Sequence, residues 1–343
     1  MGWSVIGHRR VVDDLRRSLQ DGAVAHAYLL AGPRSIGKME IALNLAQALN
    51  CAAPAAERPC GACRACQRIR QGKHADVRTI GLNTGEHKGE NRRDILIEQI
   101  KELQQAADLR PFEGACRVFI IDGAEHLNQE AANCLLKTLE EPPSGVYILL
   151  LATDLSRLLP TTVSRCRTHE LQGVPARDIA AALLIQGQQL EQAQHLARWS
   201  EGRIGWALRA AADPALLDAR RDALEQAIAL SSQPLYHRLR SAGAFAGAFS
   251  RDREALYLWL ALLAQWWRDV LLVKTGRPDL VTNDDRIGML EETAAALPIS
   301  DIAAAIVSVR DAVGQLRGNV NAHLALEMLM LRLPMAQPAK AVS

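Results

Sequence analysis

The sequence has little net charge, few aromatic residues and no long uninterrupted apolar run. Its 343 residues include 40 Lys and Arg against 38 Asp and Glu, a formal net charge of +2, and only 4% of them are aromatic. Such a composition does not provide the combined basic and aromatic stripe typical of a single-stranded nucleic-acid binder, although it does not exclude a local basic patch. The bulk composition therefore argues against a dedicated DNA-binding module.

The apolar segments are too short or too interrupted to predict membrane insertion. The first residues, MGWSVIGHRR, contain no apolar core of signal-peptide length. The longest apolar stretch, ALYLWLALLAQWWRDVLLVK, is interrupted by Gln265, Arg268 and Asp269, which favours a buried helix over a membrane span. We expect a soluble cytoplasmic protein. Its 49% hydrophobic residues are sufficient for real cores, and its length favours two or three domains.

Seven cysteines, an odd number in a chain expected to be intracellular, favour thiols or metal ligands over disulfides. Four of them form the pattern C-x8-C-x2-C-x2-C, namely Cys51, Cys60, Cys63 and Cys66. Two-residue spacings let thiolates converge on one ion, and four sulfurs suit tetrahedral zinc with no position left for water. The pattern therefore predicts a structural zinc site.

Other interpretations of the cysteines stay open. The four could be free thiols, or a C-x-x-C pair among them could be a redox dithiol, although a dithiol needs only two of them. His74 could serve as a ligand, but a surface or turn histidine is the simpler interpretation. The remaining three lie in strand or helix patterns and are expected to be small core residues: Cys116, Cys134 and Cys166.

The first half of the chain alternates strand-like and helix-like segments, which predicts an α/β domain with a mainly parallel sheet. The expected strands are AYLLAG, RVFIID and GVYILLLAT, and the expected helices are GKMEIALNLAQALN and NQEAANCLLKTLEE. The second helix should end before Pro142-Pro143, because proline disrupts helical geometry. Sequence periodicity thus places a strand, a glycine loop and a helix in succession.

From about residue 172 the strand signals stop and Ala/Leu-rich helical patterns follow. Breaks occur near Gly202 to Gly205, at Asp213-Pro214 and at Arg277-Pro278. We therefore expect an α/β core over residues 1–171, a small helical domain over 172–212 and a larger helical domain over 213–334. Residues 335–343 are expected to be a disordered tail.

The glycine loop GPRSIGKM nearly matches the phosphate-binding pattern G-x-x-x-x-G-K-[ST]. Gly32, Gly37 and Lys38 occupy the required positions, but Met39 stands where a hydroxyl would hold magnesium. A thioether is a poor ligand for this hard cation. The glycines fit either residual nucleotide binding or a tight strand-to-helix turn without a ligand.

A second catalytic group is missing after the strand RVFIID. Asp122 stands where a magnesium-binding acid is expected, yet the next residue is Gly123 and not the glutamate that would activate water. Glu125 lies two residues further and is expected to point elsewhere. The two losses together predict that the chain does not hydrolyse ATP.

Several segments together resemble the clamp-loader subunits of bacterial DNA polymerase III. They are HAYLLAGPRSIGK, the four-cysteine insert, ANCLLKTLEEPP, LLLAT, SRC at residues 164–166 and NVNAHLALEMLMLRL near the end. The resemblance covers nearly the whole chain. It implies an AAA+ core, a helical lid and a collar domain that assembles with partner subunits.

Within that family, the ATPase members carry a P-loop hydroxyl, an Asp-Glu pair and an arginine in the lid. This chain has Met39, Gly123 and, in EGRIGWAL, Gly205 at the position of the lid arginine, with Arg203 nearby. The pattern is similar to that of the members that do not hydrolyse ATP. The resemblance further implies that Arg165 of the SRC motif reaches the ATP site of a neighbouring subunit, where such an arginine contributes roughly 10³ to 10⁵ in rate.

The resemblance implies a subunit of a hetero-oligomeric ring, formed with ATPase (γ/τ) subunits and a δ subunit, that places a sliding clamp on primer-template DNA. Two alternatives stay open: an active γ/τ-type ATPase, and a zinc-dependent DNA-binding module that retains a P-loop. An ATPase assay on the isolated chain discriminates the first, and salt-dependent DNA binding by it discriminates the second.

Overall fold

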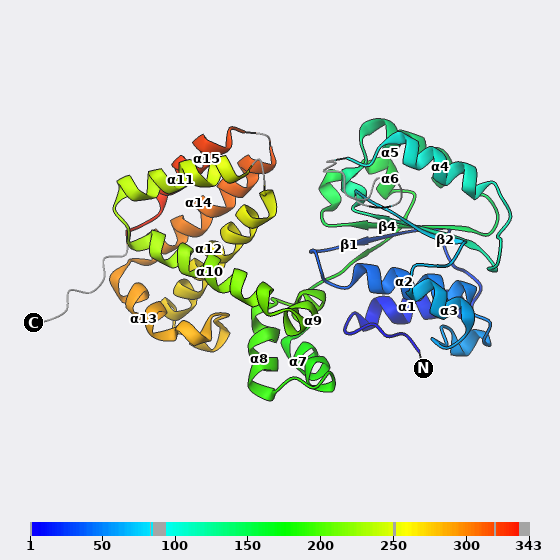
Figure 1. Ribbon diagram of the computed structural model, residues 1–343, viewed down its shortest axis with the longest axis horizontal. Helices are drawn as coiled ribbons and strands as arrows, with labels where there is room; N and C mark the ends of the chain where they lie inside the picture. Colours follow the sequence, from blue (N-terminus) through cyan, green and yellow to red (C-terminus); the bar gives the residue numbers. More distant parts are fainter. Residues whose placement is uncertain (1, 83, 85–93, 250–251, 319, 336–343) are drawn as a thin grey trace, which may run out of the picture. The chain divides into compact units, whose positions relative to one another are not determined.

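The computed structural model describes residues 2–82, 84, 94–249, 252–318 and 320–335 and divides the chain into two compact units, Met1–Leu208 and Arg209–Ser343 (Figure 1). Each unit has its own hydrophobic core. The boundary expected at residues 171/172, between the α/β core and a lid, stays a prediction. The tail expected to be disordered lies, apart from its first residue, outside the described residues.

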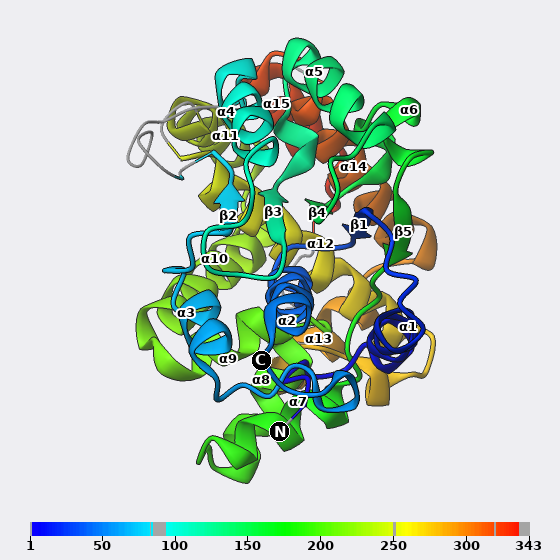
Figure 2. The same cartoon turned by 90° about the vertical axis from the view of Figure 1, so that its right-hand side faces the viewer.

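The first unit is built on a parallel sheet that has five strands among the described residues, in the order β2-β3-β4-β1-β5 (Figure 2). The strands are β1 (Ala27–Ala31), β2 (Val77–Ile80), β3 (Arg117–Asp122), β4 (Val146–Ala152) and β5 (Arg167–Glu170). The predicted α/β class is confirmed, and β1, β3 and β4 coincide with the three strands expected from the sequence. The edge strands β2 and β5 are short and partly polar, VRTI and RTHE, and carry little hydrophobic signal.

Helices cover both faces of this sheet (Figure 1). One face packs on α1 (Arg9–Gln20), α2 (Lys38–Asn50) and α3 (Arg64–Arg70), and the other on α4 (Ile97–Ala107), α5 (Gln129–Glu140) and α6 (Pro160–Val163). Successive side chains of a strand point to opposite faces, so Tyr28 and Leu30 join the first layer while Leu29 joins the second. Burial on both faces explains why β1, β3 and β4 are nearly continuous apolar runs.

Because all strands are parallel, their carboxyl ends lie along one edge of the sheet. The glycine loop follows β1 at this edge, Asp122 ends β3 there, and Thr153 follows β4. Ligands of open α/β sheets bind at this edge. The fold therefore gathers the sequence-predicted nucleotide residues in one place.

The first unit continues with the helices α7 (Ala176–Ile185) and α8 (Leu190–Trp199), and α9 (Ile204–Ala212) runs across the boundary between the units. In the second unit the described residues form α10 (Pro214–Ser232), α11 (Leu235–Phe249), α12 (Arg253–Lys274), α13 (Ile287–Ala296), α14 (Ile299–Arg317) and α15 (Ala322–Arg332). Short 3-10 turns occupy Ala55–Glu57, Ala124–His126, Leu155–Arg157, Pro278–Leu280 and Asp284–Arg286. No strand lies among the described residues beyond β5, as expected from the sequence.

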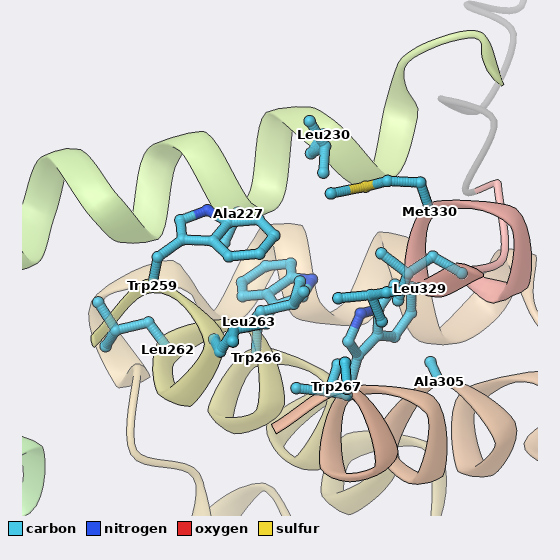
Figure 3. Close-up of a cluster of buried hydrophobic side chains, with 14 of the residues drawn as sticks. Ala227, Leu230, Trp259, Leu262, Leu263, Trp266, Trp267, Ala305, Leu329 and Met330 are labelled. Carbon is cyan, nitrogen blue, oxygen red and sulfur yellow. The ribbon is translucent and has the colours of Figure 1, made fainter. Parts of the chain in front are cut away.

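Helix α12 is the centre of the second core. Its Trp259, Trp266 and Trp267 are almost fully buried, and the cluster also takes in Leu230 from α10 and Met330 from α15 (Figure 3). Among the described helices, α12 alone is long and apolar enough to cross a membrane. The number of such spans rises to two if the bent pair Asp284–Ala296 and Ile299–Arg317 is counted as one span. Within the protein, however, 56% of the α12 stretch is buried. The expected buried helix is thus confirmed.

One of the two charged residues that interrupt this apolar helix is itself buried. Asp269 is 0% exposed, and its carboxylate accepts hydrogen bonds from the backbone N–H groups of Thr282 and Asn283, at 3.1 and 2.9 Å, and from the Asn283 side chain at 2.8 Å. Burial raises the pKa of Asp269, while these donors oppose the rise. The carboxylate thereby fixes the loop between α12 and α13 against the core.

Candidate functional site

The glycine loop takes backbone conformations that require glycine at its two ends. Gly32 has φ 149°, and a Cβ there would lie 2.6 Å from the carbonyl oxygen of Leu171. Gly37, with φ 114°, immediately precedes α2. Both residues are therefore needed for the turn itself. Their presence does not by itself indicate a bound phosphate.

The lysine of the loop is occupied by the loop's own carbonyl groups. Lys38 is 8% exposed, and its ammonium donates hydrogen bonds to the carbonyl oxygens of Gly32 and Pro33, the latter at 2.8 Å. Burial lowers the pKa of Lys38, whereas the negative charges of Glu125 and Asp122 raise it. Contact with a phosphate would require the ammonium to exchange these carbonyl bonds for phosphate oxygens.

The segment at the start of α9 packs directly on the loop. The backbone N–H of Gly205 donates to the Ser35 carbonyl at 2.8 Å, and a Cβ at position 205 would lie 3.0 Å from that oxygen. A larger residue would require the loop or the helix to shift. Arg203 donates instead to the carbonyl of Ser200 at 2.9 Å and lies over the Trp206 ring. The arginine near the lid position is thus bonded within its own helical segment.

Glu125 belongs to this site, contrary to the expectation that it points elsewhere. It is 8% exposed, and its Oε1 accepts from the Thr153 backbone N–H at 3.1 Å and from the Thr153 hydroxyl. Its Oε2 has no partner among the described residues. Its charge acts on both Lys38 and Asp122. The turn at Gly123, with φ 80°, carries the chain round to this position, and the sequence gives no direct signal of that turn.

Asp122 lies at the end of β3, as expected. Desolvation raises its pKa, and the Lys38 charge opposes the rise. The site therefore contains a lysine and two carboxylates but no hydroxyl at position 39, where Met39 is packed against the core. This arrangement retains the framework of a nucleotide site without the magnesium hydroxyl.

We expect the isolated chain not to hydrolyse ATP above background. Met39 cannot ligate magnesium as a hydroxyl does, and Gly123 provides no carboxylate at the usual water-activating position. The measurement is phosphate release by the pure chain, with Lys38→Ala as the matched control. Steady turnover that Lys38→Ala abolishes would contradict the expectation, and loss of that turnover in Glu125→Gln would identify Glu125 as the substitute base.

The four cysteines of the predicted zinc site come together in space. Cys51 follows the last residue of α2, Cys63 precedes α3, and Cys66 lies inside α3. The four Sγ atoms, which include that of Cys60, all lie within 4.8 Å of one another, and those of Cys51 and Cys63 are 4.0 Å apart. Sulfurs about 2.3 Å from a tetrahedral zinc are about 3.8 Å apart, so the set fits the ion after a small contraction.

Backbone N–H groups support the cysteine sulfurs. Those of Ala53 and Cys60 point to the Cys51 sulfur at 3.5 and 3.3 Å, and that of Cys63 points to the Cys60 sulfur at 3.3 Å. Such donors stabilise thiolates, the form that binds metal. The Gln47 side chain donates to the Cys66 carbonyl at 2.8 Å, which ties the module to α2. The donor set is therefore consistent with structural zinc.

Among the described residues, the group that could hold a metal ion consists of the four cysteines alone and does not include His74. His74 is 4% exposed, and its Nδ1 accepts from the backbone N–H of Asp76 at 3.2 Å. The sequence indicated that His74 is a surface or turn histidine: it lies in a turn, but it is buried and not on the surface. Cys116 is buried, whereas Cys134 and Cys166 are partly buried against the core. Burial raises the pKa of Cys116 and that of Cys166 to about 12, so both remain neutral thiols.

Arg165 lies in the loop between α6 and β5. Its Nη2 is 2.5 Å from Oε1 of Glu140, its Nη1 donates to the Thr161 carbonyl at 3.0 Å, and its side chain is 34% exposed. Arg167, two residues on, instead makes contacts of 2.7 and 2.8 Å to the two carboxylate oxygens of Asp14. Arg167 is thus committed to joining β5 to α1.

Arg165 and the glycine loop lie at opposite ends of the parallel strands. The loop follows the carboxyl end of β1, whereas Arg165 precedes the amino end of β5, which is parallel to β1 and paired with it. A five-residue strand separates the two ends by about 16 Å. The arginine is therefore not placed to act at the glycine loop of its own chain.

The class of protein follows from the order of the parallel strands, the glycine loop after β1, the acid at the end of β3 and the start of α9 packed on the loop: these features are those of an AAA+ protein with a P-loop framework. Residues 7–175 match the family model described as DNA polymerase III, delta subunit, and residues 216–334 match the model of the delta subunit's C-terminal part. The chain is 28% identical over 335 residues to DNA polymerase III subunit delta′ of Bacillus subtilis, which covers 94% of this chain and 95% of that protein. It belongs to the delta′ (δ′) subunits of DNA polymerase III, in the clamp-loader AAA+ family.

Other relatives match over a shorter part. DNA polymerase III subunit tau of Salmonella typhimurium is 36% identical over 215 residues, which are 63% of this chain and 31% of tau. Among solved structures, a γ subunit-related protein of Thermotoga maritima aligns over 94% of this chain and 98% of that one, at 16% identity and a TM-score of 0.42. That structural likeness is too distant to carry an argument.

Proposed function

We propose that this δ′ clamp-loader subunit acts as a non-hydrolysing stator. In this role it completes the ATP site of an adjacent ATPase subunit with Arg165 and helps to hold the ring that loads the sliding clamp on primed DNA. Its partners are the γ/τ ATPase subunits and the δ subunit, in the cytoplasm. The observation that carries the proposal is the position of Arg165, partly exposed and at the sheet edge opposite to its own nucleotide framework.

The state of that framework supports the same role. The loop lysine is bonded to its own loop, and Gly205 contacts Ser35 where ATPase members of the family carry a lid arginine. Under this proposal the loop is retained as architecture, and any nucleotide it takes up is not turned over. Reconstitution with the γ/τ ATPase and δ subunits, followed by clamp loading on primed DNA, tests the whole proposal. The proposal fails if omission of this chain leaves loading unchanged.

A second candidate, a γ/τ-type ATPase, draws on the 36% identity to tau and on Glu125, a buried carboxylate near Lys38. The similarity to tau ends after 215 residues, whereas that to delta′ continues over nearly the whole chain. The phosphate-release assay with Lys38→Ala separates the two candidates.

The second unit is proposed to assemble with the corresponding domains of partner subunits. One face of α15 is unusually apolar for an exposed helix: Leu324, Met328 and Leu331 are 58%, 44% and 52% exposed. They follow the spacing i, i+4, i+7, which places them on one stripe. The opposite face packs in the core through Leu326 and Leu329. The stripe is therefore free for an external contact without loss of the fold.

We expect Leu324→Asp combined with Met328→Asp to leave the chain folded and to weaken its assembly with partner subunits by about tenfold or more. Charges placed in a buried apolar contact are costly, whereas on an exposed helix face they cost the monomer little. Sedimentation of reconstituted complexes measures the effect without nucleotide. The control is Ile185→Asp on α7, where an 87% exposed apolar residue lies outside the second unit. Equal assembly by both variants would contradict this use of α15.

A further inference from the structure

The ion pair between Arg165 and Glu140 joins two segments that the sequence keeps 25 residues apart. Glu140 is the last residue of α5, and Arg165 follows α6, which packs against α5. The side chains are 48% and 34% exposed, so the pair lies at the protein surface. The arginine that the proposed function assigns to a neighbouring subunit is thus already held by a carboxylate of its own chain.

The contacts of the guanidinium leave room for a second anion. Nη2 contacts Glu140, while Nη1 donates to the Thr161 carbonyl at 3.0 Å and contacts the Ser164 hydroxyl at 3.5 Å. A guanidinium carries five N–H donors, so these three contacts leave two for an outside group. The remaining N–H groups can donate to phosphate oxygens, the acceptors that arginine commonly binds. The arginine can keep Glu140 while it binds an anion.

The Arg165–Glu140 ion pair is strong enough to orient the arginine side chain but too weak to keep it from binding another anion. Arginine has many rotamers, and their loss opposes any contact made by a free side chain. A half-exposed ion pair shifts an equilibrium by less than about tenfold. Such a pair can reduce the number of conformations before the neighbour arrives, but it is too weak to hold the arginine away from a phosphate.

We propose that Glu140 is a positioning residue for Arg165: it orients the guanidinium toward the γ-phosphate at the ATP site of the adjacent subunit. This inference rests on the proposed trans role of Arg165. Glu140 touches no nucleotide and acts only through Arg165. Glu141, the next residue, is exposed and follows the end of α5, which makes it a matched control.

The test uses reconstituted clamp-loader complexes that contain Glu140→Gln, Glu140→Asp or Glu141→Gln. We expect Glu140→Gln to lower kcat for DNA- and clamp-stimulated ATP turnover by about three- to tenfold and to leave KM for ATP unchanged. Glu140→Asp should restore part of the rate because it keeps the charge. Glu141→Gln should behave as wild type.

The double variant Glu140→Gln with Arg165→Ala decides whether Glu140 acts through the arginine. We expect the double variant to be no slower than Arg165→Ala alone. A further drop in the double variant would assign Glu140 a structural role, and a faster Glu140→Gln would make the pair a restraint; either result overturns the inference, as does an unchanged rate. If Arg165→Ala itself runs at the wild-type rate, the proposed function fails first, so the two failures are distinguishable.

Discussion

Protein purified without chelator should contain one zinc ion per chain, and Cys63→Ser should lose it. Four sulfurs within 4.8 Å of one another, in a C-x8-C-x2-C-x2-C pattern, match a closed tetrahedral site. Structural zinc contributes roughly 10–16 kcal/mol of apparent binding energy, and a local fold that depends on it loses that energy with a ligand. Elemental analysis measures the ion directly.

The consequence of zinc loss should be local. The module connects α2 to α3, whereas the core around α12 is separate. Hydrogen exchange after Cys63→Ser should therefore rise in residues 51–70 and stay slow in α12. Cys134→Ser is the control, because Cys134 lies in α5 and should keep the metal. If elemental analysis finds no zinc in wild-type protein whose cysteine thiols are reduced, the zinc site is refuted.

The fold was predictable where burial leaves a strong pattern in the sequence. β3 and β4 are central strands with both faces covered, so nearly every residue in them is apolar. β2 and β5 lie at the edges of the sheet, where polar side chains are tolerated, and the sequence did not indicate them. The cysteine cluster could be predicted for a different reason: two C-x2-C spacings in succession are a local pattern that favours a metal site, whatever the surrounding fold.

The parts of the site that the sequence did not reveal depend on tertiary contacts. Glu125 reaches Thr153 only because the chain turns at Gly123, and those two partners belong to different strand ends. Gly205 meets Ser35 across 170 residues of sequence. The Glu140–Arg165 pair likewise requires α5 and α6 to pack together. No local pattern encodes such pairings, so they emerged only with the fold.

In the reconstituted complex, Arg165→Ala should leave this chain folded and assembled but slow the neighbouring ATP site by about 10³-fold or more. Under the proposed function, that site would lose the positive charge that offsets the γ-phosphate in the transition state. The ion pair with Glu140 is half exposed, so its loss should change the stability of the chain itself by no more than about 1 kcal/mol. Stimulated ATP turnover and clamp loading measure the first effect, and thermal unfolding measures the second.

Two further variants separate charge from geometry in this prediction. Arg165→Lys should restore little activity, because an ammonium does not reproduce the planar, two-pronged contact of a guanidinium with phosphate. Complexes with Arg167→Ala should load clamps nearly as well as wild type, because the Arg167 guanidinium contacts both carboxylate oxygens of Asp14 within the same chain. If Arg165→Ala and Arg167→Ala both load clamps at the wild-type rate, Arg165 does not act in trans and the chain serves the ring as a scaffold alone.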